Sequence, residues 1–251
     1  MLVAERKQLV LARLHQEGKI VARELAEELA ISEASVRRDL RDLAAAGQCQ
    51  RVYGGAVPVS RALVDYRSRA GVEPESKQRI AARAVQLIKP GDRVILDGGT
   101  TTLAVTRALP PDLQATVITH SPTIAAALID HPTVEILLLG GRIYKHSAVA
   151  CGVATAEAAR TINADLFLLG VTGVHARYGL TTGDAEEAAM KRALARQAAD
   201  TYVLASSEKI GAVSPYKILE LSATTAILTD AADDEGLNAL RHTAPAIIKC
   251  A

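Results

Sequence analysis

Short, nearly all-apolar segments alternate with helical patterns along the chain after residue 74. Strands that are buried on both faces of a parallel sheet have such continuous apolar runs, and helices connect them. Aromatic residues make up only 3% of a sequence that is 49% hydrophobic, so aliphatic side chains must form the core. That composition favours helices and parallel strands over an aromatic-rich β-sandwich. We predict strands at 93–96, 116–119, 134–139, 166–169, 202–205 and 226–229, with helices at 75–88, from Thr102, and at 122–130, 153–161 and 185–199.

The loop after the first predicted strand is rich in glycine and threonine. It reads DGGTTT from Asp97 to Thr102 and opens a helix. In parallel sheets, ligands bind beyond the carboxyl ends of the strands. Glycines let the backbone approach an anion, amides at a helix start attract it, and hydroxyls hydrogen-bond its oxygens. The Walker pattern GxxxxGK[ST] is absent. We expect a phosphate cradle; a tight turn that only caps the helix is the alternative.

Polar or glycine-rich loops also follow the later predicted strands. They include His120-Ser121, Gly140-Gly141, the loop from Gly170 to Gly173, and the loop from Ser206 to Lys209. Because the carboxyl ends of parallel strands share one edge of a sheet, we expect these loops to converge on one ligand site.

The segment from Gly179 to Arg192, GLTTGDAEEAAMKR, places carboxylates and cations at the start of a predicted helix. Carboxylates could bind sugar hydroxyls, and Lys191 could meet an anion. An i, i+4 salt-bridged surface helix explains Glu187 and Lys191 equally well. Both interpretations remain open from the sequence.

The segment from Ile31 to Ala56 has the pattern of a DNA-reading helix followed by a basic hairpin. Ser32 is a suitable N-cap, and Val36, Leu40 and Leu43 form an apolar stripe at i, i+4 and i+7. The opposite face has small residues and then arginines, as a helix entering the major groove requires. The candidate DNA-binding residues are Ser35, Arg37, Arg38, Arg41, Arg51 and Tyr53.

A second apolar stripe at 22–29 lies just upstream, separated from Ser32 by only two residues, which suits the tight turn of a helix-turn-helix. A first helix is predicted at 4–17, and the alternation from Gln48 to Val57 predicts a short hairpin, the wing. The alternative without a DNA-binding role is an amphipathic surface helix whose charges are only solvated. Residues 35–58 contain four arginines against two aspartates. With so modest an excess, tight DNA binding would need two or more copies.

These features resemble the DNA-binding domain of the DeoR family of bacterial transcriptional regulators. The resemblance rests on LAEEL at 25–29, SVRRDL at 35–40 and the Gly-Gly-Ala that ends at Ala56. The chain departs from the family pattern with Ser35-Val36 in place of Thr-Ile, Tyr53 in place of histidine, and Cys49 at a usually aliphatic position. The departures concern individual base contacts.

The C-terminal part resembles the sensor domain of the same family, so the resemblance covers nearly the whole chain. Its marks are DGGTTT, GLTTGDAEEAAMKRA and the loop that ends in Lys209, where ASSEK replaces the commoner loop with Asp before Ser-Lys. The resemblance implies an α/β fold related to ribose-5-phosphate isomerase and a phosphorylated sugar as effector. The candidate effector-binding residues are Asp97, Gly99, Thr100, Thr101, Thr102, Ser121, Thr172, Gly173, Glu187, Lys191 and Lys209.

The expected architecture is therefore α/β with two domains: a winged helix-turn-helix at 1–57, a linker at 58–73, and an α/β sensor domain at 74–251. The linker lacks periodicity and is bounded by prolines, and solvated charges are the expected state of Arg67 and Arg69.

Several classes of protein are disfavoured. The three cysteines are far apart without a CxxC pair, and the histidines are not at metal-ligand spacing, so we expect no disulfide framework, metal or cofactor. No apolar run reaches the ~18 residues of a membrane span. The first 18 residues are too charged for a signal peptide. We expect a cytoplasmic protein.

The leading hypothesis is a homo-oligomeric regulator, dimer or tetramer, that binds double-stranded DNA and responds to a phosphorylated sugar. A repressor of carbohydrate genes is expected, although the sequence does not separate repressor from activator. The competing hypothesis is a sugar-phosphate isomerase with a DNA-binding appendage, in which Asp97, Asp184 or Glu187 would be the base. No nucleophile and base pair is fixed by the sequence, so we assign no catalytic residue.

Overall fold

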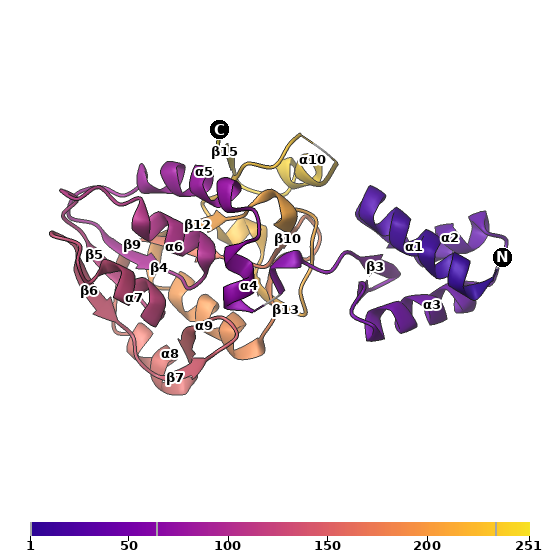
Figure 1. Cartoon of the computed structure of the whole chain (residues 1–251), viewed down its shortest axis with the longest axis horizontal. Helices are drawn as coiled ribbons and strands as arrows, with labels where there is room; N and C mark the ends of the chain where they lie inside the picture. Colours follow the sequence, from indigo (N-terminus) through magenta and orange to yellow (C-terminus); the bar gives the residue numbers. More distant parts are fainter. Residues whose placement is uncertain (1, 64, 234) are drawn as a thin grey trace.

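The computed structural model describes residues 2–63, 65–233 and 235–251. The N-terminal part contains three helices, α1 (Val3–Glu17), α2 (Ala22–Glu28) and α3 (Glu33–Ala45). In Figure 1 this part lies at one end of the molecule, and the larger α/β domain lies at the other. Ser32 caps α3 by accepting a hydrogen bond from the Ser35 amide. Val36, Leu40 and Leu43 are buried against residues of α1 and α2, as the stripe predicts.

A small antiparallel sheet completes the N-terminal part, with the strand order β1 (Ile20–Val21), β3 (Gly55–Val57), β2 (Gln50–Val52). Strands β2 and β3 are the predicted wing. The extended residues before α2 pair with β3 as well, which the sequence did not predict. Gly55 permits this third strand, because a Cβ atom at Gly55 would lie 1.7 Å from the carbonyl oxygen of Ile20.

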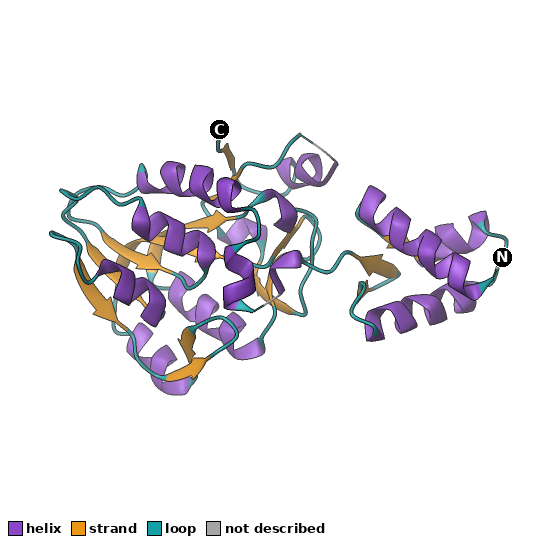
Figure 2. Ribbon diagram, viewed as in Figure 1, coloured by secondary structure: helices purple, strands orange, loops and turns teal. Residues whose placement is uncertain are grey.

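The C-terminal domain is built on a seven-stranded sheet with all strands parallel, in the order β15-β14-β12-β9-β4-β5-β6. The strands are β4 (Arg93–Leu96), β5 (Thr116–Thr119), β6 (Glu135–Leu138), β9 (Ala164–Gly170), β12 (Ala198–Leu204), β14 (Ala226–Thr229) and β15 (Ile247–Lys249). Figure 2 shows these strands between helices. The predicted parallel sheet is confirmed.

Helices cover both faces of this sheet, and the alternation along each strand explains why. In β4, Val94 and Leu96 pack on one face, whereas Ile95 packs on the other. The first face is covered by α5 (Pro74–Val85), α6 (Thr100–Arg107) and α7 (Pro122–Leu128). The second is covered by α8 (Val153–Ala159), α9 (Ala185–Ala195) and α10 (Glu235–Arg241). The domain therefore has three layers with a hydrophobic core on each side of the sheet.

Two smaller β elements, which the sequence did not predict, lie beside the main sheet. One is an antiparallel sheet of β10 (Gly173–His175), β11 (Gly179–Thr182) and β13 (Tyr216–Leu219). The other is a hairpin of β7 (Arg142–Tyr144) and β8 (Val149–Cys151). The predicted helix at 185–199 is too long, because the chain enters β12 at Ala198 and pairs with β9. Short 3-10 turns complete the chain at η2 (Ser207–Lys209) and η3 (Leu221–Ala223).

The segment expected to be an unstructured linker is partly helical. It contains a 3-10 turn, η1 (Arg61–Leu63), and a short helix, α4 (Tyr66–Ala70); Val64 lies outside the described residues. Asp65 caps α4 by accepting from the amides of Arg67 and Ser68. Arg67 is exposed, as expected. Arg69 is only 9% exposed, so the expectation of a solvated charge is wrong for that residue.

Candidate functional site

The outer face of α3 presents a cationic surface. Arg37, Arg38 and Arg41 are exposed, and Ser35 is partly exposed. On the wing, Arg51 is exposed and the Tyr53 side chain is 88% exposed. All six candidate residues therefore lie on accessible surface, as the apolar stripe implies for the four on α3.

Ion pairs within the N-terminal part hold its acidic groups away from that surface. Asp39 is buried against Arg6, with 2.5 Å between Nε and Oδ2, and Asp42 pairs with Lys7 at 2.7 Å. Arg37 pairs with Glu33. Arg38, by contrast, makes no hydrogen bond or ion pair with any described residue, and neither does Arg41. The face therefore presents more free positive charge than the residue count suggests, and Arg6 and Lys7, which the sequence analysis missed, are responsible.

Replacing Arg38 by alanine is expected to weaken specific DNA binding by about 1–3 kcal/mol if its fork reads a base. The exposed Arg38 guanidinium has no internal partner, so the substitution should leave folding intact. Competition binding with a duplex selected by the full-length protein measures the effect. Arg160→Ala removes the same charge from α8 and should have no such effect. Unchanged affinity in Arg38→Ala would exclude Arg38 from the base contacts.

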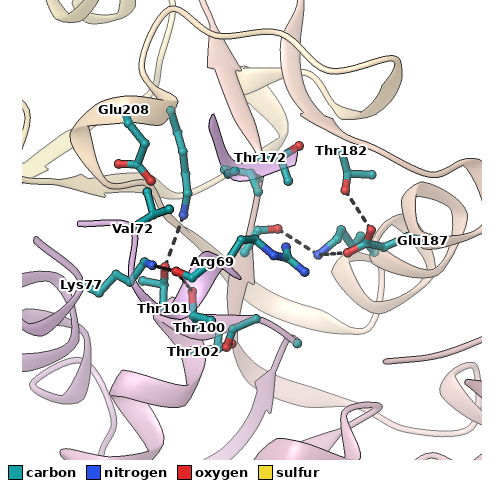
Figure 3. A pocket seen from close by; sticks show the side chains of 17 residues that line it. Arg69, Val72, Lys77, Thr100, Thr101, Thr102, Thr172, Thr182, Glu187 and Glu208 are labelled. Atoms are coloured by element: carbon teal, nitrogen blue, oxygen red, sulfur yellow. Dashed lines mark hydrogen bonds and ion pairs between the residues drawn. The ribbon is translucent and has the colours of Figure 1, made fainter. Parts of the chain in front are cut away.

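A polar pocket of about 450 Å³, including the part open to solvent, lies at the carboxyl ends of β4 and β9. Its lining comes from η1, from α4 and the residues after it, from α5, from the loop that opens α6, from the loop after β9, from the end of β11, from α9 and from η2. Figure 3 shows Arg69, Lys77 and Thr100 gathered on one side of it, with Thr182 and Glu187 on the other. The lining residues are Ala62, Arg69, Val72, Lys77, Gly98, Gly99, Thr100, Thr101, Thr102, Gly170, Val171, Thr172, Thr182, Glu187, Lys191, Glu208 and Lys209.

Helix α6 begins at this pocket with its first turn uncapped by any side chain. Its N-cap, Gly99, has φ 128°, a conformation that L side chains rarely adopt. The first amides of a helix lack intrahelical acceptors, so those of Thr100, Thr101 and Thr102 are available to a ligand. This geometry is the predicted anion cradle.

Three buried cations surround the cradle, and no carboxylate of the described residues lies within ion-pair distance of them. Lys77 donates to the carbonyl of Arg69 at 2.5 Å, and Lys209 donates to Thr101 Oγ1 at 3.3 Å. Arg69 donates from Nη2 to the His146 carbonyl at 3.2 Å. Glu208 partly compensates the charges of Lys77 and Lys209, and its Oε2 is buried without a hydrogen-bond partner among the described residues. Buried cations with so little pairing are disfavoured unless an anion joins them.

The pKa values of the buried lysines reflect this shortage of negative charge. Burial, together with the neighbouring charges of Lys77, Arg69 and Lys191, lowers the pKa of Lys209 from 10.5 to about 8, and Glu208 opposes this shift. Burial likewise lowers the pKa of Lys77. A bound anion would raise both values. The pocket therefore favours an anionic ligand.

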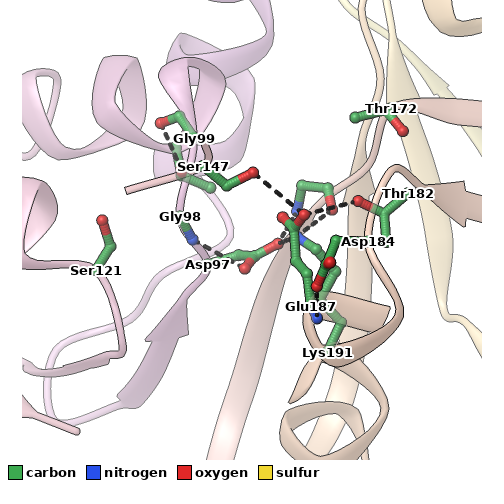
Figure 4. A network of polar contacts seen from close by, with 12 residues as sticks. Asp97, Gly98, Gly99, Ser121, Ser147, Thr172, Thr182, Asp184, Glu187 and Lys191 are labelled. Atoms are coloured by element: carbon green, nitrogen blue, oxygen red, sulfur yellow. Dashed lines mark hydrogen bonds and ion pairs between the residues drawn. The ribbon is translucent and has the colours of Figure 1, made fainter. Parts of the chain in front are cut away.

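Beneath the pocket lies a closed network of charged groups (Figure 4). Asp97 is fully buried and contacts Lys191 Nζ, His120 Nε2 at 2.9 Å and the Gly170 amide at 2.9 Å. Lys191 also pairs with Glu187 at 3.4 Å. Burial alone would raise the pKa of Asp97, but the charge of Lys191 and the His120 hydrogen bond outweigh it and lower the pKa to about 2. Asp97 therefore links Lys191, His120 and the Gly170 amide to one another beneath the pocket.

The structure brings eight of the eleven candidate effector residues to the pocket wall. Asp97, Ser121 and Gly173 do not line it. Ser121 is fully buried, and its hydroxyl donates to the Ala148 carbonyl. A Cβ atom at Gly173 would lie 2.5 Å from the Ala212 carbonyl oxygen, so Gly173 serves the close packing of β10.

Sequence reasoning missed the four other polar or charged side chains of the pocket, Arg69, Lys77, Thr182 and Glu208, as members of the site. Lys77 lies in the predicted helix at 75–88, to which no role in the site was assigned, and Arg69 lies in a stretch without periodicity. One local signal was available for Thr182, which belongs to the Gly179–Arg192 motif and donates to Glu187 at 3.0 Å.

Comparison with known families agrees with this two-part construction. The model of the DeoR-like helix-turn-helix domain matches residues 6–62, and that of the DeoR C terminal sensor domain matches residues 72–231. The chain belongs to the DeoR family. This DeoR-family chain is thus a DNA-binding transcriptional regulator, and the resemblance of both its parts is confirmed.

Named relatives match over nearly the full length. The transcriptional regulator GlpR of Haloferax volcanii is 32% identical over 92% of this chain and 91% of the relative. The transcriptional repressor GlcR of Bacillus subtilis is 33% identical, covering 90% and 88%. The glycerol-3-phosphate regulon repressor of Escherichia coli is 27% identical, covering 88% of each chain.

Among solved structures, ribose 5-phosphate isomerase A from Methanocaldococcus jannaschii matches 54% of each chain with 18% identity and a TM-score of 0.41. The sorbitol operon regulator SorC from Klebsiella pneumoniae covers 90% of this chain and 96% of that one, with 13% identity and a TM-score of 0.41. Such weak likenesses transfer no chemistry. Within the described residues, no helix is long and apolar enough to cross a bilayer, and no group of three side chains has metal-ligand geometry.

Proposed function

We propose that this DeoR-family regulator is a repressor whose affinity for DNA is controlled by a phosphorylated sugar bound in the pocket at the start of α6. The observation that carries the proposal is the set of three buried cations, Arg69, Lys77 and Lys209, around the uncapped helix start. A phosphoryl group supplies the missing negative charge and several acceptors. The proposed effector contacts are those of the pocket wall, Gly99, Thr100, Thr101, Thr102, Thr172, Glu187, Lys191 and Lys209, to which we add Arg69 and Lys77.

The remaining pocket groups suit the sugar part of such a ligand. Thr172 and Thr182 present hydroxyls, and Glu187 presents a carboxylate on the side opposite the cations (Figure 3). Relatives whose names refer to glycerol 3-phosphate and to sugar operons support this class of effector. The DNA contacts we propose are Ser35, Arg37, Arg38, Arg41, Arg51 and Tyr53.

Binding without catalysis is the proposal for this site. Asp97, one candidate base of the enzyme hypothesis, is fully buried and tied to a lysine, a histidine and an amide. Glu187 accepts from Ser147 and Thr182. Asp184 caps α9 by accepting from the Glu187 amide. With their lone pairs engaged, these carboxylates are poor general bases.

A panel of aldose and ketose phosphates, each beside its unphosphorylated sugar, tests the proposal by thermal shift. A ligand that binds only the folded state raises the melting temperature by mass action. We expect at least one phosphorylated sugar to raise it, its unphosphorylated counterpart not to do so, and neither to be consumed. Turnover of a sugar phosphate would support the isomerase instead, and no shift with any phosphorylated compound would refute the effector class.

We also propose that the regulator acts as a homo-oligomer of at least two chains in the cytoplasm. The cationic α3 face of one chain offers few contacts to DNA phosphates. Two chains bound to repeated half-sites of the operator would combine the contacts of both faces. Sedimentation of the free protein should give a mass of at least two chains; a monomer that binds DNA as one chain would contradict this.

A further inference from the structure

The segment between the two domains is attached to the wall of the effector pocket. Just after the wing strand β3, Val59 forms a parallel bridge with Val213, and the Ser60 hydroxyl donates to the Thr172 carbonyl. Ala62 lines the pocket. Only four residues therefore separate the end of the wing at Val57 from the pocket wall.

Arg69 on α4 faces the same pocket with part of its hydrogen-bonding capacity unused. Its Nη2 lies 3.2 Å from the His146 carbonyl oxygen and 3.2 Å from Ser147 Oγ. Its Nε is buried and has no hydrogen-bond partner among the described residues. A buried donor without an acceptor is costly and rare in folded proteins. An anion in the pocket would supply that acceptor.

The backbone of α4 is connected to the cradle as well. The carbonyl of Arg69 accepts from Lys77 Nζ at 2.5 Å and from Thr100 Oγ1 at 3.5 Å. Lys77 and Thr100 also line the pocket (Figure 3), so a phosphoryl group would compete with the Arg69 carbonyl for the same donors. An anion in the pocket therefore changes the contacts of both the backbone carbonyl and the side chain of Arg69.

We propose that Arg69 binds the anionic group of the effector directly, and that residues 59–70 transmit occupancy of the pocket to the wing. This inference rests on the proposed function and adds the residue and the segment through which it acts. Without an anion, Lys77 and Thr100 hold the Arg69 carbonyl. With an anion, both donors turn to the ligand, Arg69 Nε gains an acceptor, and the segment that begins at the wing takes another set of contacts. The effector thereby favours the arrangement of residues 59–70 in which the Arg69 side chain contacts the anion over the one in which Lys77 and Thr100 hold the Arg69 carbonyl, as a population shift requires.

A purely structural role for Arg69 is the alternative. The guanidinium lies 6.0 Å from the centre of the Tyr66 ring and holds the turn between β7 and β8 through His146 and Ser147. In that role Arg69 would stabilise the domain without responding to a ligand. Hydrogen exchange in the presence of phosphate separates the two roles, because only the first changes exchange at 59–70.

The experiment uses hydrogen exchange with mass spectrometry on the full chain, with inorganic phosphate as the probe and chloride at matched ionic strength as the reference. In the wild type we expect phosphate to slow exchange at 98–103 and to change exchange at 59–70. In Arg69→Gln, half-saturation at 98–103 should need ~10-fold more phosphate, the loss expected for one charged hydrogen bond. The response at 59–70 should be smaller than in the wild type even at saturation, because only the contacts of Lys77 and Thr100 with the backbone carbonyl of residue 69 can still change.

Arg67→Gln is the matched control, because Arg67 lies exposed on the same helix, and it should behave as wild type. Ser60→Ala provides a second variant if Arg69→Gln is too unstable to measure. It removes the hydroxyl that donates to Thr172, so 98–103 should respond at the wild-type phosphate concentration while the response at 59–63 is lost.

The outcomes separate the two proposals. If phosphate slows exchange at neither segment of the wild type, the anion site itself is wrong. If it slows exchange at 98–103 but changes nothing at 59–70, the effector site stands and this inference is overturned. A response at 59–70 that is as large in Arg69→Gln as in the wild type would also overturn it.

Discussion

Replacing Lys191 by methionine is expected to lower the free energy of unfolding at pH 7 by about 3–5 kcal/mol, the usual cost of leaving a buried charge without its partner. Lys191 is 2% exposed, pairs with Asp97 and Glu187, and donates to the Gly170 carbonyl at 3.0 Å. Without it, two carboxylates face each other in the interior with only His120 and neutral donors to stabilise them. Urea denaturation of both proteins measures the difference.

The pH dependence of that loss tests its electrostatic origin. In the wild type, the pKa of Asp97 is lowered from 3.8 to about 2, so its contribution to stability is present above pH 4 and disappears as the pH falls through 2. In Lys191→Met, burial dominates and the pKa of Asp97 rises, so the deficit should shrink as the pH falls from 7 towards 4. Arg196→Met, an exposed change at the end of the same helix, should cost less than about 0.5 kcal/mol. A deficit that is equally large at pH 4 and pH 7 would show that packing, not charge, is lost.

Replacing Lys209 by methionine is expected to weaken binding of the phosphorylated sugar by about 2–5 kcal/mol, roughly 30-fold or more. Lys209 is buried in the pocket wall and contacts Thr101 at the start of α6. Isothermal titration with a sugar phosphate found by thermal shift measures the loss. Lys217→Met, which removes an exposed lysine paired with Glu220, should bind as wild type.

Stability should change in the opposite direction from binding. The pKa of Lys209 is lowered from 10.5 to about 8. Near pH 7 the charged lysine therefore destabilises the empty protein. The free energy of unfolding rises as the pH rises from about 8 to 10.5, because the unfolded chain then binds more protons than the folded protein. Lys209→Met should therefore unfold no more easily than wild type. In the wild type, affinity for the anion should fall as the pH rises above 8, because the lysine loses its proton. A variant that loses stability and binding together would contradict this assignment.

Local pattern was enough to predict the main sheet and the recognition helix. Strands β4, β5 and β14 begin and end at the predicted residues, because each is a short apolar run bounded by polar or glycine residues. The buried stripe of α3 and its Ser32 cap followed from spacing alone. The sheet of β10, β11 and β13 was missed because its strands are short and partly polar, and tertiary packing defines them.

The pocket was predictable where a loop after a strand, or a motif that the chain shares with the family, carried its residues. Gly99 to Thr102 were found together because they are contiguous, whereas Arg69 and Lys209 meet from places 140 residues apart in the chain. The pair of Arg6 and Asp39 is separated by 33 positions and also has no local signature. Contacts of that kind depend on the fold, so single-sequence reasoning assigned the charge of Arg69 to solvent and did not find the pair of Arg6 and Asp39.

The central claim is that an anion in the pocket changes how the arginine face of α3 meets DNA. The most direct test is fluorescence anisotropy of a labelled duplex, selected by the full-length protein, with increasing amounts of a sugar phosphate at constant ionic strength. We predict that the phosphorylated sugar changes the DNA dissociation constant about 5- to 150-fold, the range of ordinary allosteric coupling, and that the unphosphorylated sugar does not. A sugar phosphate that binds the protein and leaves DNA affinity unchanged would contradict the account.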